Sequence, residues 1–105
     1  MSWFYLLIAG LFEIGWPVGI KLAQSQNLRV IGIFSAIVCM SLSGLFMWMA
    51  QKTIPMGTAY AVWTGIGAAG TFLVGVWFFG DPTSLLRYLG VAFIIAGVAL
   101  LKLAG

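Results

Sequence analysis

The chain of 105 residues is 63% hydrophobic and only 7% charged, with five basic residues, two acidic residues and no histidine. Soluble domains carry roughly a quarter charged residues, so this composition cannot build a water-facing surface and predicts an integral membrane protein. The net charge of +3 does not indicate a nucleic-acid partner, because the basic residues are scattered along the chain. Without histidine and with one cysteine, the chain can form neither a His/Cys catalytic pair nor a metal cluster. We also expect no enzyme activity and no cofactor.

Four apolar runs are each long enough to cross a membrane as a helix, which takes roughly 20 residues. They lie at about 3–22, 30–50, 56–79 and 85–103. Backbone groups cannot stay unpaired in lipid, so the runs are helices, and the short polar segments between them leave nothing to fold outside the bilayer. We predict an all-α fold, with residues 1–105 as a single transmembrane domain built as a four-transmembrane-helix bundle.

The first run is not interpreted as a signal peptide, because it lacks a basic leader and contains a carboxylate. That carboxylate, Glu13, lies about ten residues into the run and therefore near the middle of the bilayer. A charged group costs roughly 3 kcal/mol there, and such residues commonly mark ion or substrate pathways. Desolvation disfavours the charged form, so Glu13 can exchange a proton for a cation. A structural hydrogen bond between helices is the plainer alternative.

The neighbours of Glu13 on the same helix face leave space beside the acid. Gly10 lies one turn before it and Trp16 one turn after it. Pro17 cannot donate to the carbonyl of Glu13, so we expect the helix to loosen or bend in this turn. A packing role for Pro17 is an equal alternative.

Ser41 and Ser43 are polar residues in the second helix, whose sequence is otherwise largely apolar and rich in methionine. Bonding to a carbonyl of their own helix is the more common role of such residues. Ser43 could instead orient the carboxylate of Glu13. Cys39 has no partner in the chain, so no intrachain disulfide is expected.

One face of the third helix is both polar and aromatic, and consists of Tyr60, Trp63, Thr64 and Gly67. The Tyr60 hydroxyl could bond Glu13, and Trp63 with Trp16 offers π faces to a cation. An aromatic belt at the membrane surface is the alternative, although Trp63 lies well inside the run.

Glycines punctuate the third and fourth helices. The segment from Gly65 to Gly70 matches a dinucleotide fingerprint only formally, because no strand precedes it and it lies inside a membrane span. Its glycines instead favour close helix approach and a flexible point. In the fourth helix, Gly90 and Gly97 predict a face of small residues for packing.

The basic residues predict an orientation only weakly. The loops after the first and third helices hold Lys21, Arg29 and Arg87, whereas the opposite side holds Lys52 and Lys102. Lys and Arg set topology, and three against two is almost no bias. The chain could therefore insert both ways round and yield two oppositely oriented copies.

The segment from Gly10 to Trp16 (GLFEIGW), the run from Pro55 to Gly67 (PMGTAYAVWTGIG) and the length near 105 residues resemble the small multidrug resistance (SMR) family. The resemblance covers the whole chain. The tryptophan three residues after the glutamate and the W-T-G-I-G sequence look most like the guanidinium-exporter branch. Two positions depart from the pattern: Pro17 cannot be carried over from it, and Asp81 stands where a glutamate is common.

The resemblance implies a multi-pass protein of the bacterial inner (plasma) membrane that works as an antiparallel, dual-topology homodimer. The two copies of Glu13 would form one shared substrate and proton site. Gly65 and Gly67 would be the conformational hinge, and Gly90 and Gly97 would hold the dimer. Residues lining the site or hydrogen-bonding its carboxylates would be Gly10, Trp16, Ser43, Tyr60 and Trp63.

We therefore predict a proton-coupled antiporter that exports guanidinium and small guanidinyl cations by alternating access, with cation and protons competing for the paired Glu13 carboxylates. A planar guanidinium matches a carboxylate bidentately, whereas a quaternary ammonium has no hydrogen to donate. The partners would be the cation, protons, the lipid bilayer and a second copy of the chain. The alternatives are a multidrug exporter of hydrophobic quaternary ammonium cations, a non-transporting membrane assembly subunit, and a heteromer with a second similar chain.

Overall fold

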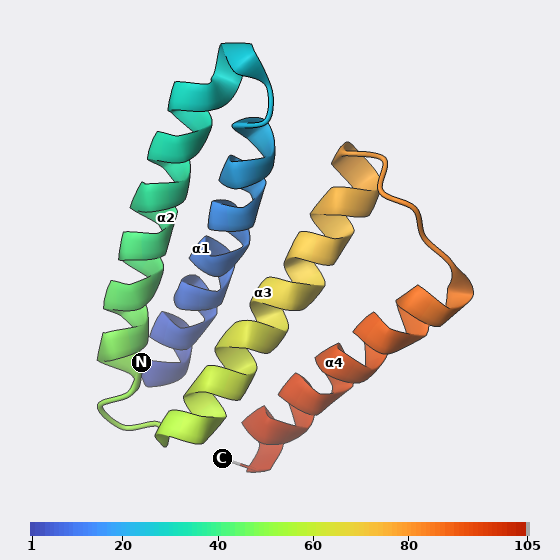
Figure 1. The fold of residues 1–105 in the computed structure, drawn as a ribbon. Helices are drawn as coiled ribbons and strands as arrows, with labels where there is room; N and C mark the ends of the chain where they lie inside the picture. The colour runs from blue at the N-terminus through green and yellow to red at the C-terminus, as the bar shows by residue number, and fades with distance from the viewer. Residues whose placement is uncertain (105) are drawn as a thin grey trace.

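The computed structural model describes residues 1–104 and consists of four long helices (Figure 1). They are α1 (Ser2–Leu22), α2 (Arg29–Ala50), α3 (Met56–Phe78) and α4 (Leu85–Ala104), with a short 3-10 turn, η1 (Gln26–Leu28), before α2. All four are long and apolar enough to cross a membrane. The predicted all-helical, four-span architecture is confirmed. Successive helices run in opposite directions, so the two ends of the chain lie at the same end of the molecule (Figure 1).

Proline and glycine set the helix boundaries. Pro55 precedes α3 with an extended backbone (φ −55°, ψ 143°), and its carbonyl accepts the N–H of Ala59 at 2.9 Å. Beyond the end of α3, Gly80 adopts φ 68°, the left-handed conformation that a residue without a Cβ enters at little cost. Before α4, the Ser84 hydroxyl accepts the N–H of Arg87 at 3.3 Å, which satisfies one free donor of the first turn.

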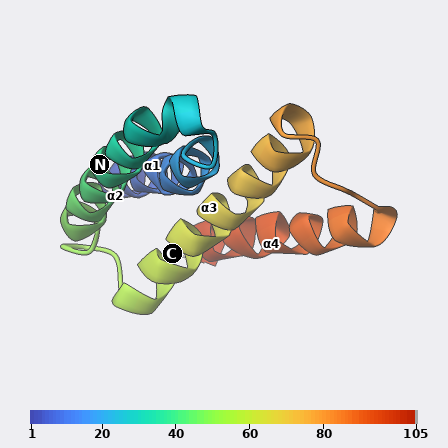
Figure 2. The ribbon, with the colours of Figure 1, turned by 45° about the horizontal axis from the view of Figure 1, so that its top comes forward.

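The helices form an open arrangement, 44 × 34 × 16 Å in extent, instead of a closed bundle. Helix α1 packs between α2 and α3, and α4 packs against α3. Turning the molecule shows α4 lying beyond α3, away from the α1–α2 pair (Figure 2). No residue of α4 is buried. One chain therefore leaves a large part of its fourth helix uncovered by protein.

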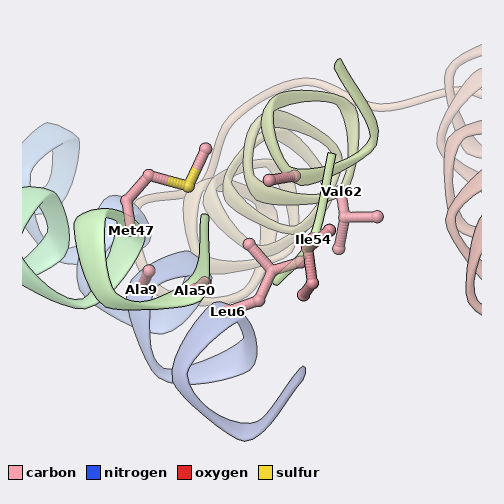
Figure 3. Close-up of a cluster of buried hydrophobic side chains, with 7 residues drawn as sticks. Leu6, Ala9, Met47, Ala50, Ile54 and Val62 are labelled. Atoms are coloured by element: carbon pink, nitrogen blue, oxygen red, sulfur yellow. The ribbon is translucent and has the colours of Figure 1, made fainter. Parts of the chain in front are cut away.

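The buried core is small and lies where α1, α2 and α3 meet, at the end of the molecule that carries the N-terminus (Figure 3). Its largest fully buried side chains are Leu6 of α1 and Val62 of α3, and Met47 of α2 also belongs to it. The other members of the cluster are Ala9, Ala50, Ile54 and Ala59. Small residues suit a protein in lipid, where helices associate by close packing because the surrounding tails are as apolar as leucine.

Helices α1 and α2 cross at two glycines. A Cβ on Gly32 would lie 2.5 Å from the carbonyl oxygen of Gly19, and one on Gly19 would lie 2.8 Å from the carbonyl oxygen of Gly32. Backbone atoms cannot yield to such a contact, so the crossing requires glycine on both helices. This close crossing holds α1 in place for the site on its other side.

Candidate functional site

Glu13 lies in the middle of α1, half-buried, and faces α3. Its side chain rests on Gly67, because a Cβ at position 67 would lie 2.5 Å from Cγ of Glu13 and 3.2 Å from its Cβ. Carbon atoms pack at about 3.5–4.0 Å, so any larger residue at position 67 would displace the carboxylate. Because Gly67 has no side chain, the space beside it is available to the side chain of Glu13.

Glu13 lines a groove of about 440 Å³ between α1 and α3. The groove gives the carboxylate an opening toward the outside of the chain, as a site that exchanges cations requires. Of the residues predicted for the site, it brings together Glu13 and Gly67. The other lining residues are Pro17, Thr64, Ala68, Thr71, Phe72 and Asp81.

A buried hydrogen-bond chain connects three helices one turn from Glu13. The Ser43 hydroxyl of α2 donates to the Ala9 carbonyl of α1 at 2.7 Å, and Trp63 Nε1 of α3 donates to the Ser43 oxygen at 2.8 Å. Ser43 is completely buried. Ala9 is four residues before Glu13, so in an α-helix its carbonyl also accepts the N–H of Glu13. The chain thus joins the indole of Trp63 to the backbone of the turn that carries the carboxylate.

Ser43 does not donate to a carbonyl of its own helix, although that is the most common role of a serine in an apolar helix. Its single hydroxyl proton goes across to α1, because Ala9 lies opposite it at hydrogen-bond distance. Back-bonding is found instead at Thr64, whose hydroxyl donates to the Tyr60 carbonyl at 2.8 Å. Within one chain, Ser43 therefore fixes α1 and Trp63 relative to each other.

All five residues predicted to line the site lie outside the lining of the Glu13 groove: Ser43 and Trp63, described above, and Tyr60, Trp16 and Gly10. Tyr60 is 58% exposed on the outer face of α3, and its ring lies 5.5 Å from that of Trp63 at an angle of 55°. Trp16 is half-buried on α1. Gly10 lies under Ile66, where a Cβ would come within 2.7 Å of Cγ2, so it serves the approach of α1 to α3.

The predicted hinge and dimer glycines lie on α3 and α4. Helix α3 is continuous through Gly65 and Gly67, and a Cβ on Gly65 would lie 2.6 Å from Cγ2 of Val98 on α4. Gly65 thus forms the α3–α4 contact. A Cβ added to Gly90 or Gly97 would meet no atom of the described chain within 4 Å. Their face of α4 is open.

Pro17 lies inside α1, which remains helical from Ser2 to Leu22. Pro17 lines the same groove as Glu13. Because proline has no N–H, it also leaves the Glu13 carbonyl without its usual helical donor. The groove is also lined by Thr71, Phe72 and Asp81, which no sequence pattern predicts at this site. Asp81 carried one signal that could have found it, since it is the only other acidic residue of the chain.

Four helices long and apolar enough to span a membrane, with an accessible carboxylate in the middle of one of them, are typical of small membrane transport proteins. Comparison with known proteins identifies which kind. Residues 1–94 match the family described as Small Multidrug Resistance protein. The chain belongs to this family, which confirms the resemblance of its sequence, and it is a multi-pass protein of the bacterial inner membrane.

The chain is similar over almost its full length to proteins named guanidinium exporter. It is 43% identical over 104 residues to the one from Yersinia pseudotuberculosis, covering 99% of both chains. It is also 43% identical to the one from Salmonella typhimurium and 42% identical to the one from Citrobacter freundii, covering 99% of this chain and 98% of each relative.

Proposed function

We propose that this protein is an antiporter that exports guanidinium and small guanidinyl cations in exchange for protons, with the Glu13 carboxylate as the common binding site. The observation that carries this proposal is the position of Glu13, in the middle of a membrane span and at the wall of a groove between α1 and α3. The identity of 43% to guanidinium exporters supports the substrate class.

Competition for one carboxylate gives the exchange. A guanidinium cation offers parallel N–H pairs that a carboxylate accepts bidentately. A protonated Glu13 has lost the negative charge and one acceptor oxygen, so it does not hold the cation. A proton that enters from one side therefore displaces the cation, and a cation that enters from the other side displaces the proton.

The proposed working unit is an antiparallel homodimer. Three observations support it. The basic residues are nearly equally divided between the two membrane sides, α4 has no buried residue, and the face of α4 at Gly90 and Gly97 is open. Membrane transporters commonly place their site at the interface of two inverted repeats, and a chain of four helices has room for one repeat only. A second copy would supply the other Glu13, and Gly90 and Gly97 would pack against it.

In this dimer, the two carboxylates would share a site lined by both chains. The outward-facing ring of Tyr60 is available to a partner subunit, and Trp16, Trp63, Ser43 and Gly10 would surround the pair. Alternating access would proceed by a bend of α3 at Gly65 and Gly67, since residues without a Cβ there permit α3 to move against Val98 and Glu13.

Electrical currents from purified protein in liposomes on a solid-supported membrane test the function. We expect guanidinium to produce currents and a bulky aromatic quaternary ammonium to produce none. Glu13→Gln removes the exchangeable charge at nearly constant volume and should abolish coupled transport while cross-linking still detects the dimer. The matched control, Glu13→Asp, keeps a carboxylate and should remain coupled, although at a lower rate because the shorter side chain retracts the carboxylate by about 1 Å.

The same preparation tests the competition by its pH dependence. Because a proton on Glu13 excludes the cation, the apparent affinity for guanidinium should fall as the pH is lowered, by up to about tenfold per pH unit when one proton is displaced per cation. Proton-driven guanidinium transport by Glu13→Gln at the wild-type rate would contradict the proposal. Currents only with the quaternary ammonium would indicate a multidrug exporter instead.

A further inference from the structure

Both acidic residues of the chain line one groove. The sequence contains only Glu13 and Asp81 as acids, 68 positions apart, and both border the groove of about 440 Å³ between α1 and α3. The first lies in the middle of a membrane span and the second in the loop after α3. A path from the membrane surface to Glu13 therefore carries a second carboxylate where it begins.

The backbone holds Asp81 against α3. The left-handed turn at Gly80 reverses the chain, and the N–H of Asp81 then donates to the Gly75 carbonyl at 3.0 Å. The Asp81 carboxylate lies over Gly75 so closely that a Cβ at position 75 would collide with Oδ2. Pro82 follows, and its fixed φ restricts the loop further. The carboxylate is thereby packed back toward the groove.

The two acidic side chains contact α3 in a similar way, each packed against a glycine. Glu13 rests on Gly67 and Asp81 rests on Gly75. These glycines are eight residues apart, roughly 12 Å along a helix that rises 1.5 Å per residue. Thr71 lies halfway between them and lines the groove with its polar side chain. A cation at Asp81 would thus be about two helical turns from the central site.

Lys21 borders the outer part of the same path. A hollow of about 200 Å³ adjoins the groove, shares Pro17, Thr71 and Asp81 with it, and adds Lys21 from the last turn of α1. The Lys21 ammonium beside this hollow would compete with an arriving cation for Asp81. Such competition keeps the outer position weak, and a cation path needs sites weak enough to release the ion onward.

We propose that Asp81 is a second cation-binding residue, which captures guanidinium at the mouth of the groove before the cation moves to Glu13. This proposal rests on the function proposed above. A carboxylate at the entrance of a cleft raises the local concentration of cations and their rate of entry. Because Asp81 is exposed, its effect operates through water and is sensitive to salt. In the antiparallel dimer, each membrane face would carry one such entrance.

The test is the guanidinium concentration dependence of the current from liposomes that contain the full chain with Asp81→Asn. We expect KM to rise roughly tenfold in 0.01 M salt, where charges act over about 30 Å, with the maximal current unchanged. In 1 M salt, where they act over about 3 Å, the difference should shrink below about twofold. Asp81→Asn does not add a basic residue, so the weak orientation bias is preserved.

Two controls separate position from net charge. Asp81→Glu keeps the carboxylate in the groove and should retain a nearly wild-type KM. The double variant Asp81→Asn with Thr83→Asp restores the charge two residues along the exposed loop, at a position outside the groove lining, and should behave like Asp81→Asn. Elution as the wild-type oligomer confirms that each variant is folded.

An unchanged KM in Asp81→Asn, or rescue by the Thr83→Asp charge, would overturn the capture role. The proposed function is judged separately, by the wild-type guanidinium current and its loss in Glu13→Gln. Wild-type current together with an unaffected Asp81→Asn would remove this inference alone. A silent wild type would remove both.

Discussion

Replacing Gly67 by alanine should disable the central site while leaving the fold nearly as stable. The added Cβ would lie 2.5 Å from Cγ of Glu13, about 1 Å short of ordinary carbon contact at 3.5–4.0 Å. The contact is with a side chain, so Glu13 can move away. The carboxylate must therefore shift by about 1 Å out of the position over α3.

Stability and function should respond very differently to this change. Overpacking costs roughly 1–3 kcal/mol, whereas alanine gains about 1 kcal/mol over glycine in a helix, so the net destabilisation is about 0–2 kcal/mol. A displacement of about 1 Å of a group that positions a substrate costs on the order of a hundredfold in rate. We expect loss of transport from a protein that still folds.

The assay combines guanidinium currents with thermal unfolding in detergent. Gly44→Ala is the matched control, since Gly44 lies within α2 and has no neighbour within 4 Å of an added Cβ. It should keep full transport and gain slight stability. Wild-type transport by Gly67→Ala would refute the argument that Gly67 sets the position of the carboxylate, and unfolding of this variant would show that α1 and α3 cannot yield there.

Two further predictions concern the hydrogen-bond chain and the dimer. Ser43→Ala removes the acceptor of Trp63 Nε1 and the donor to Ala9. Ser43→Ala should lower the free energy of unfolding by roughly 1–3 kcal/mol, measured by denaturation in mixed detergent. An unchanged stability would show that these two hydrogen bonds do not stabilise the fold. Lysine substitutions at Gln24 and Thr83 together would change the basic count from three against two to five against two. This variant should insert one way and lose transport when expressed alone; full activity in a single orientation would exclude the antiparallel dimer.

The number and type of helices could be predicted from the sequence because both depend on local properties. Hydrogen bonding within a helix satisfies the backbone in lipid, so an apolar run of about 20 residues is sufficient to specify a span. The depth of Glu13 follows in the same way, from its distance to the ends of its own run. The family resemblance likewise depends on short segments around Glu13 and Trp63. The comparisons confirm the family.

The neighbours of Glu13 were decided by the tertiary structure. In water, the apolar stripe of a helix reveals the face that is buried, but in lipid the outer face is equally apolar and the pattern loses this information. Helix α1 meets α2 and α3 where glycines permit close approach, as at Gly19 and Gly67, and these contacts select the residues that line the groove.

Asp81 and Ser43 illustrate the difference. The sequence shows Asp81 only as a loop acid and Ser43 only as a serine in an apolar helix. The turn at Gly80 and the missing side chain of Gly75 place Asp81 at the groove of Glu13. The approach of α1 to α2 brings the Ala9 carbonyl to the Ser43 hydroxyl. Spans are therefore determined within single segments, whereas the site depends on which helix faces meet, because only the packing of small residues distinguishes one apolar face from another.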